Sequence, residues 1–188
     1  MGEAIERNPP MLPDAEFYDV YIQPLEETMM HCIWRVVQNR EDARDAMQEA
    51  LATIWRKRGR IAAHPKPEAL VLRICRAKAI DLLRKAIRRG RWEQPLSLPE
   101  EAWPVPADSP SPTAGLDGQE TLCQVRRVIA TLPRKQAQAV LMHLVEEQPY
   151  ADVATALGCS EATIRSHVRR GRERLRTELQ HLQGGTPP

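Results

Sequence analysis

The sequence predicts an all-α protein of two small helical domains joined by a flexible, proline-rich linker. Apolar residues recur at helical spacing in several stretches, and no long stretch alternates apolar and polar residues as a half-buried strand would. Six of the 16 prolines fall between residues 95 and 112, where a helix cannot persist. A glycine near residue 158 precedes an arginine-rich helical stretch, which predicts a helix-turn-helix in the second domain.

The first domain is expected over residues 14–91, where apolar spacing predicts three helices. They cover residues 14–38, 40–58 and 67–89. Pro24 should interrupt the first helix, because proline lacks the N–H that the helix needs. Gly59 should end the second helix. Pro67 suits the first turn of the third helix, and Gly90 should close it, since helices often end at a glycine with positive φ.

The second domain is expected over residues 118–180 and should hold four helices. Leucine, isoleucine and valine at helical spacing mark the first of them. Pro133 should open the second helix and Pro149 should stop it. A short third helix ends at Gly158, and Ser160 is placed to cap the fourth. The last two helices have the spacing of a helix-turn-helix.

The formal net charge of +2 hides a division along the chain. Residues 14–91 carry 16 basic and 11 acidic groups, and residues 121–188 carry ten basic and six acidic groups. Residues 92–120 carry six acidic groups and neither lysine nor arginine. This pattern predicts two domains that face nucleic acid and an acidic linker over residues 92–117. We expect disorder at both ends, in residues 1–13 and 181–188.

One face of the helix at residues 40–58 is acidic. Opposite its apolar stripe it carries Asp42, Asp45, Gln48 and Glu49. Asp45 and Glu49 are like charges four residues apart, which is unfavourable in an isolated helix. The face therefore suggests a surface for a basic partner, with a merely solvated acidic face as the alternative. Catalytic carboxylates have little support, because no cluster of histidine, cysteine or further acids accompanies them.

The helix at residues 67–89 is strongly basic. Residues 73–91 hold eight basic groups and one acid, Asp81. The cations expected to bind phosphate are Arg73, Arg76, Lys78, Arg84, Lys85, Arg88 and Arg89. They surround much of the helix and leave only the stripe of Ile74, Ala77 and Leu82 to pack. A soluble cationic surface helix is the alternative.

The last helix carries the residues expected in a DNA groove. Its inner face has Ile164, Val168, Gly171 and Leu175 at helical spacing. The cap and the outer face provide Ser160, Glu161, Thr163, Arg165, Ser166, Arg169, Arg170 and Arg172. Arginine reads guanine and glutamate accepts from cytosine, so this face fits the major groove and its phosphate walls. An ordinary helical hairpin with a solvated basic face is the alternative.

Composition excludes several classes of protein and of site. The chain has no apolar run near 18 residues and no signal-peptide pattern, so we expect a cytoplasmic protein. Cys32, Cys75, Cys123 and Cys159 are not at metal-ligand spacing and are expected to be buried thiols. A zinc site with His31 and Cys32, or a redox role, is the alternative. We expect no catalytic site, metal, cofactor or small-molecule substrate.

Two blocks of the sequence resemble a known family, the bacterial RNA polymerase sigma factors of the extracytoplasmic-function (ECF) group within the sigma-70 family. The resemblance to their region 2 lies in EDARDAMQEALATIWRK and RICRAKAIDLLRK. The resemblance to their region 4 lies in TLPRKQAQAVLMHLVEEQPYADVATALGCSEATIRSHVRRGRERLR. The order of the blocks, the lack of a domain between them and the chain length all agree with the group.

The resemblance implies a role for each surface. The acidic face would dock on the coiled coil of the largest subunit of the polymerase core. The helix at residues 67–89 would bind the −10 promoter element and help to open it, with residues 59–66 near a captured base. The helix at residues 160–176 would read the −35 element. An anti-sigma factor is expected as a further partner, and whether that partner has a membrane anchor is left open.

Two departures from the family pattern concern the −10 base. Ala69 and its neighbours stand where the family usually has a tryptophan, and Ala77 replaces the usual asparagine. These departures imply that the −10 base is captured in a way that differs in detail from the family. The function that the resemblance predicts is a promoter-specificity subunit of the polymerase, not an enzyme. A stand-alone helix-turn-helix DNA-binding transcription regulator is the alternative. A nucleic-acid enzyme is disfavoured, because no nucleophile lies in a cluster of arginines outside the reading helix.

Overall fold

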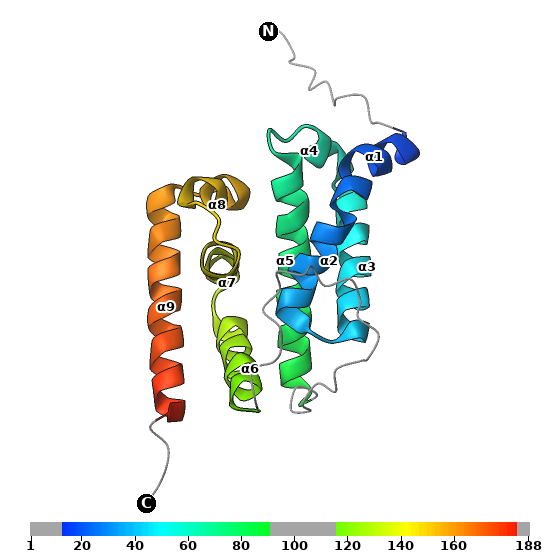
Figure 1. The fold of residues 1–188 in the computed structure, drawn as a ribbon. Helices are drawn as coiled ribbons and strands as arrows, with labels where there is room; N and C mark the ends of the chain where they lie inside the picture. Colours follow the sequence, from blue (N-terminus) through cyan, green and yellow to red (C-terminus); the bar gives the residue numbers. More distant parts are fainter. Residues whose placement is uncertain (1–12, 91–115, 184–188) are drawn as a thin grey trace, which may run out of the picture.

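The computed structural model describes residues 13–90 and 116–183, and all of its regular elements are helical (Figure 1). The predicted all-α fold class is confirmed over these residues. The elements in chain order are α1 (Asp14–Tyr21), the 3-10 turn η1 (Gln23–Leu25), α2 (Glu26–Val37), α3 (Arg40–Arg56), α4 (Arg58–Ala62), α5 (Pro67–Arg88), α6 (Leu116–Thr131), α7 (Arg134–Val140), the π-helical turn η3 (Leu141–Val145), α8 (Tyr150–Leu157) and α9 (Glu161–Gln183).

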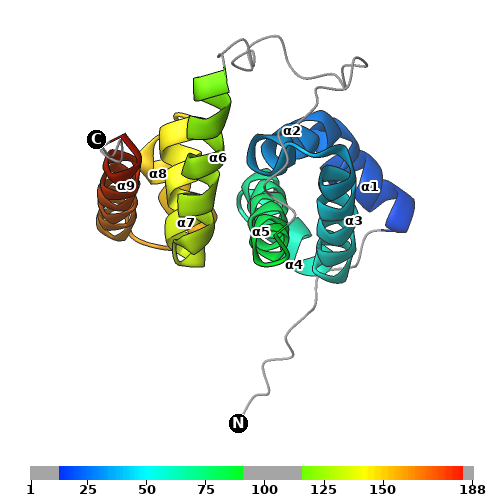
Figure 2. The ribbon, with the colours of Figure 1, turned by 90° about the horizontal axis from the view of Figure 1, so that it is seen from below.

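These elements form two groups that pack against each other. Helices α1 to α5 make up the N-terminal group, and helices α6 to α9 make up the C-terminal group. Helix α5 lies at the boundary, with α2 and α3 on one side and α6, α7 and α8 on the other. Figure 2 gives a second view of this arrangement, in which α6 and α7 face α2 and α5. Helix α9 lies on the far side of α7 from α5.

The turns predicted for the N-terminal group are confirmed with one exception. Pro24 lies in η1, which separates α1 from α2. Helix α5 begins at Pro67, and Gly90 follows its end with a φ of +66°. The expected helix end at Gly59 is wrong, because Gly59 lies within α4. The chain leaves α3 at Lys57, whose backbone needs no positive φ to do so.

The predicted helix-turn-helix is confirmed. Helix α8 ends at Gly158, which adopts the left-handed conformation with a φ of +61°. Ser160 caps α9, because its Oγ accepts the backbone N–H of Thr163 at 3.2 Å. The expected helix end at Pro149 is wrong. After α7 the helix widens into η3, which ends at Val145 before the proline is reached.

Two predicted boundaries also need correction. Helix α6 begins at Leu116, so residues 116 and 117 are helical rather than part of the linker. Helix α9 continues to Gln183, so residues 181–183 are helical rather than disordered. Pro13, also predicted to be disordered, is the N-cap residue of α1, and its carbonyl accepts the backbone N–H of Phe17 at 2.9 Å. The rest of the predicted linker, and of the two ends predicted to be disordered, lies outside the described residues.

Both groups contribute to one hydrophobic core. Buried side chains of α2, α3 and α5 form a continuous cluster with residues of the C-terminal group, namely Ile129, Leu132, Ala137, Val140 and Leu141. A second cluster lies beneath the helix-turn-helix and includes Val153, Leu157, Ile164 and Val168. The expectation that α5 packs through a single narrow stripe is therefore wrong. The C-terminal group covers a second side of α5 and buries residues there that the sequence pattern placed on its surface.

Candidate nucleic-acid and protein interfaces

The helix-turn-helix presents an outer face of polar and charged side chains. Its inner face is fixed by Ile164 and Val168, which are buried against α7 and α8. On the outer face the exposed residues are Ser160, Glu161, Thr163, Arg165, Arg169, Arg170 and Arg172, and Ser166 is half-buried. All eight residues predicted to read DNA thus lie on one accessible side of α9 or at its cap.

Two arginines of this face are held by neighbours on the same helix. Arg165 lies 3.1 Å from a carboxylate oxygen of Glu161, and Arg169 lies 2.9 Å from one of Glu173. The Arg165 guanidinium also stands 5.2 Å from the centre of the Tyr150 ring. Exposed pairs of this kind contribute about 0.3–0.5 kcal/mol, so a DNA contact can replace them.

Sequence reasoning missed two aromatic residues beside the reading face. Tyr150 stacks on His143 with ring centres 3.9 Å apart, and the guanidinium of Arg165 lies over the Tyr150 ring. His167 is half-buried on α9, and burial lowers its pKa, as do the positive charges of Arg170 and Lys135. Their signal in the sequence is weak, because a lone tyrosine or histidine in a helix has many ordinary roles.

The acidic face of α3 is only partly available to a partner. Asp45 and Gln48 are exposed, whereas Asp42 and Glu49 are half-buried. The Glu49 carboxylate accepts hydrogen bonds from Lys78 Nζ at 3.2 Å and from Lys85 Nζ at 3.3 Å. These contacts, that of Lys78 first, lower the pKa of Glu49 although partial burial opposes them.

The basic helix of the sequence is α5 in the structure. Its seven cations that were predicted to bind phosphate fall into three sets. Arg73, Arg76 and Arg84 contact the C-terminal group. Lys78 and Lys85 are bound to Glu49, as described above. Arg88 and Arg89 are exposed near the end of the helix. The structure therefore brings the predicted −10 residues together on one helix but leaves only part of them open to solvent.

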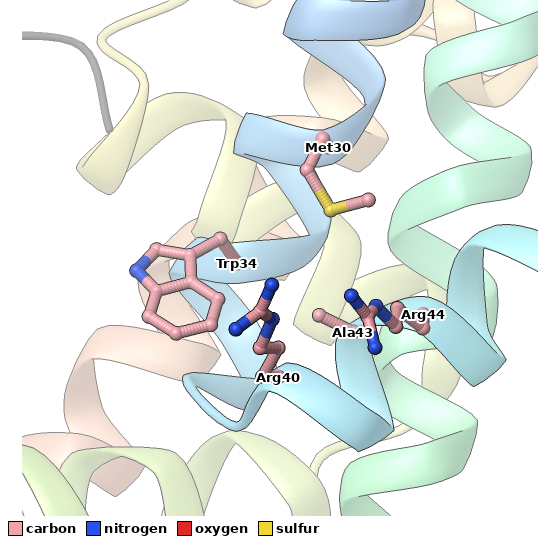
Figure 3. Close-up of a pocket in the computed structure, with 5 residues that line it drawn as sticks. All are labelled: Met30, Trp34, Arg40, Ala43 and Arg44. Carbon is pink, nitrogen blue, oxygen red and sulfur yellow. The ribbon is translucent and has the colours of Figure 1, made fainter. Parts of the chain in front are cut away.

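A shallow hollow lies between α2 and α3, close to the start of α3 (Figure 3). Met30, Trp34 and Ala43 provide its apolar lining, and Arg40 and Arg44 provide the charged part. None of these five side chains is a carboxylate, thiol or imidazole. The hollow is thus suited to neither metal coordination nor proton transfer, although its cations lie on the same helix as the acidic face.

No described part of the chain holds a group of three or more histidine, cysteine, aspartate or glutamate residues that could bind a metal ion. Cys32 and Cys75 are buried free thiols, as predicted. The expectation of burial is wrong for Cys123 and Cys159, which are half-buried. Among the described helices, none is long and apolar enough to cross a membrane.

Family models match both halves of the chain. The model for Sigma-70 region 2 matches residues 22–89, and the model for Sigma-70, region 4 matches residues 124–175. The first match contains the acidic face of α3 and all of α5. The second contains the helix-turn-helix as far as Leu175.

Two curated relatives are similar over most of this chain. The ECF RNA polymerase sigma factor SigM of Mycobacterium tuberculosis is 33% identical over 145 residues, which cover 77% of this chain and 68% of that protein. The ECF RNA polymerase sigma factor SigE of Mycolicibacterium smegmatis is 27% identical over 165 residues, which cover 86% of this chain. The chain spans 61% of the length of that second relative.

A solved structure has the same fold. It is the sigma factor RpoE from Bartonella quintana in complex with the anti-sigma factor NepR, and it has a TM-score of 0.50 and 22% identity. The similarity covers 84% of this chain and 95% of that chain. Because the chain matches both region 2 and region 4, the alternative of a stand-alone helix-turn-helix regulator is wrong. With its identity to SigM, the chain belongs to the extracytoplasmic-function sigma factors of the sigma-70 family.

Proposed function

We propose that this chain directs the core of bacterial RNA polymerase to specific promoters and assists the start of transcription there. The observation that carries this proposal is the accessible outer face of α9 in a chain that also has region 2. The polymerase would supply the chemistry, so the chain itself is not an enzyme and acts in the cytoplasm with the polymerase. Run-off transcription with core polymerase on a genomic promoter library tests the proposal. A lack of promoter-specific transcripts would contradict it.

The acidic face of α3 is assigned to the coiled coil of the largest polymerase subunit, through Asp42, Asp45, Gln48 and Glu49. Asp45 gives the cleanest test, because it is exposed, whereas reversing Glu49 would place three cations side by side with Lys78 and Lys85. Asp45→Lys should abolish co-purification with core polymerase and leave the fold intact. The matched control is Glu16→Lys, an exposed charge reversal on α1. Unchanged co-purification of Asp45→Lys would overturn the assignment.

The outer face of α9 is assigned to the −35 element. Arg165→Ala or Arg169→Ala should weaken −35 binding by about 1–3 kcal/mol if the residue makes a bidentate base contact. Lys57→Ala is the control, because Lys57 is exposed at the end of α3 and belongs to none of the surfaces assigned here. A loss that is equal for all DNA sequences would instead assign the residue to phosphate.

Helix α5 and the preceding segment, residues 59–66, are assigned to the −10 element. Part of that segment is α4 rather than a loop, so a captured base would meet a short helix and the turn after it. We also propose an anti-sigma factor as a partner. This rests on the fold shared with RpoE, which was solved in complex with NepR. Such a partner would have to cover some of the surfaces assigned above.

A further inference from the structure

Arg165 on the outer face of α9 is the end of a stack of three side chains from three different elements. The rings of His143, from η3, and Tyr150, from α8, stack with their centres 3.9 Å apart and an angle of 29° between their planes. The guanidinium of Arg165 lies over the Tyr150 ring, and its Cζ is 5.2 Å from the ring centre, within the range of a cation–π contact. A residue of the DNA-reading helix is thus supported by residues that precede that helix in the chain.

The two rings are held by the fold of the helix-turn-helix and the turn before it. His143 is half-buried, and its Nδ1 donates a hydrogen bond to the carbonyl oxygen of Gln148 at 2.8 Å. Tyr150 is the first residue of α8, and its half-buried side chain packs against the core cluster beneath the helix-turn-helix. Both rings are therefore in place without DNA. Together they form a fixed aromatic platform for the guanidinium of Arg165.

A carboxylate also holds the guanidinium of Arg165. Its Nη2 donates to Oε2 of Glu161 at 3.1 Å. Glu161 is the first residue of α9, where the helix dipole stabilises a negative charge. An arginine loses rotamer freedom when a base fixes it, and an arginine that is already held in place loses less. Arg165 is thus preorganised for a contact, because a ring and a carboxylate hold it before DNA binds.

Arg169 is a matched comparison one turn further along α9. Its side chain is 67% exposed against 64% for Arg165, and it is likewise paired with a carboxylate, that of Glu173 at 2.9 Å. Among the described residues, no aromatic ring lies over the Arg169 guanidinium. In a helix-turn-helix the N-terminal residues of the second helix contact base edges, and Arg165 is nearer to that end. The aromatic platform and the position in the helix therefore both distinguish Arg165 from Arg169.

We propose that Arg165 reads a guanine of the −35 element, that Tyr150 positions its guanidinium for this contact, and that Arg169 binds phosphate. The inference rests on the proposed function and names the residues that determine promoter choice. Guanine presents two acceptors, O6 and N7, at one edge, and a planar guanidinium donates to both only in one orientation. A guanidinium over a ring keeps N–H groups at its edge, so the platform and the base can be contacted together. The base takes the donor now given to Glu161, since an exposed ion pair is weak.

The first test measures which base pair each arginine discriminates. The full chain is assembled with core polymerase and bound to duplexes in which each base pair of the −35 element is replaced in turn. Wild type should prefer guanine at one position, and Arg165→Ala should lose about 10- to 100-fold of that preference. Arg169→Ala should weaken binding to every duplex by the same factor, because phosphate contacts carry no sequence information. A preference lost in Arg169→Ala, or kept in Arg165→Ala, overturns the assignment of the two arginines.

Two variants of Tyr150 test its positioning role. Tyr150→Phe keeps the ring and should keep the wild-type preference, whereas Tyr150→Leu removes the ring and should reduce the preference for the guanine about 2- to 5-fold. In an Arg165→Ala background, Tyr150→Leu should cause no further loss, because the ring acts through that arginine. The ratio between two duplexes bound by the same protein does not depend on how much of that protein is folded. An unchanged ratio in Tyr150→Leu, or a further loss in the double variant, overturns the positioning role.

Nuclear magnetic resonance of the free chain tests the aromatic platform without DNA and separates this inference from the proposed function. Ring currents move the resonance of a proton over the face of an aromatic ring upfield. The Nε–H resonance of Arg165, assigned by its loss in Arg165→Ala, should therefore be shifted upfield in wild type and Tyr150→Phe but not in Tyr150→Leu. An unshifted resonance in wild type overturns the platform, whatever the polymerase complex binds. If the shift is present but wild type on core polymerase prefers no DNA sequence, the proposed function fails, and the reading role of Arg165 fails with it.

Discussion

Arg76 is a buried charge, and its partner Glu146 compensates the cost of burying it. Burial by itself lowers the pKa of a guanidinium, but the hydrogen bond and the negative charge of Glu146 outweigh burial and raise the pKa of Arg76. Arg126 provides a contrast. Its Nε is buried without a hydrogen-bond partner, and burial lowers the pKa of its guanidinium. A carboxylate supplied by the other helix group thus compensates the charge of Arg76 within the core, whereas the Nε of Arg126 has no such partner.

The four free thiols should differ in reactivity. Burial raises the pKa of Cys32 to about 11, despite the nearby charge of Arg76, and raises that of Cys75 to about 12. At pH 8 the thiolate fraction of Cys32 is then about a hundredfold below that of a thiol with a pKa near 9. We expect iodoacetamide, followed by mass spectrometry of peptides, to modify the half-buried Cys123 and Cys159 first. Equal rates at all four cysteines would contradict the burial described here.

Gly171 lies where α9 crosses α7 and leaves no room for a side chain. A Cβ there would stand 2.3 Å from Cγ2 of Val140, which is buried and β-branched. Gly171→Ala should lower the free energy of unfolding by about 1–2 kcal/mol, because overpacking outweighs the gain of about 1 kcal/mol in helix propensity. Urea unfolding measures the loss. In a Val140→Ala background the same change should be neutral or stabilising, and an equal loss in both backgrounds would refute the packing argument.

At the scale of single helices, caps decide where α3 and α9 begin. Asn39 caps α3, because its Oδ1 accepts the backbone N–H of Asp42 at 3.1 Å. Asn39→Ala should therefore lower the free energy of unfolding by about 1 kcal/mol. Asn39→Ser should keep most of the stabilisation, because serine is also a good N-cap residue. Urea unfolding of the three proteins tests this. If the alanine variant is as stable as wild type, the side chain of Asn39 contributes nothing to the start of α3.

Helix boundaries were predictable where one residue determines the local backbone. Pro24 removes a helical donor, and Gly158 provides a left-handed turn, so both were identified from the sequence. Gly59 was misassigned, because glycine permits a helix end but does not require one. The π-helical turn η3 has no comparable signal in its residues. The DNA-reading face of α9 could be predicted because helical spacing alone defines it.

The contact between the groups was not predictable in the same way. Arg76 lies in a run of cations that the sequence pattern does not distinguish from one another. Glu146 lies in the other predicted domain, 70 residues away. Which arginine is buried depends on how two helix groups meet in space, and no periodicity within one helix contains that information. For this reason the sequence pattern assigned Arg73, Arg76 and Arg84 to an open surface, whereas the structure places them in a contact.

For the whole molecule, the shared core implies that the groups unfold together. Ile129, Leu132 and Val140 are buried in the same cluster as the core of α2, α3 and α5. Separating the groups would expose this apolar surface and the ends of the buried ion pair. We therefore expect the slowest-exchanging amides of α5 and α7 to share one opening free energy in hydrogen exchange. A much lower value for α7 would mean that the C-terminal group opens independently in wild type.

Hydrogen exchange also distinguishes the contribution of charge from that of packing in the contact between the two helix groups. Removing one partner of a buried pair costs about 3–5 kcal/mol if the other stays buried, but here separation of the groups can hydrate Arg76. The loss of stability in Glu146→Gln is thus limited to the free energy that holds the two groups together. The amides of α7 should then exchange faster than those of α5. Replacing both partners by methionine removes the charges and keeps apolar volume. The double variant Arg76→Met with Glu146→Met should therefore keep the groups packed and be as stable as wild type, or more stable by up to about 4 kcal/mol. Independent exchange of α7 in that double variant would show that the charges themselves, rather than the fit of the apolar surfaces, are required for the two groups to pack together.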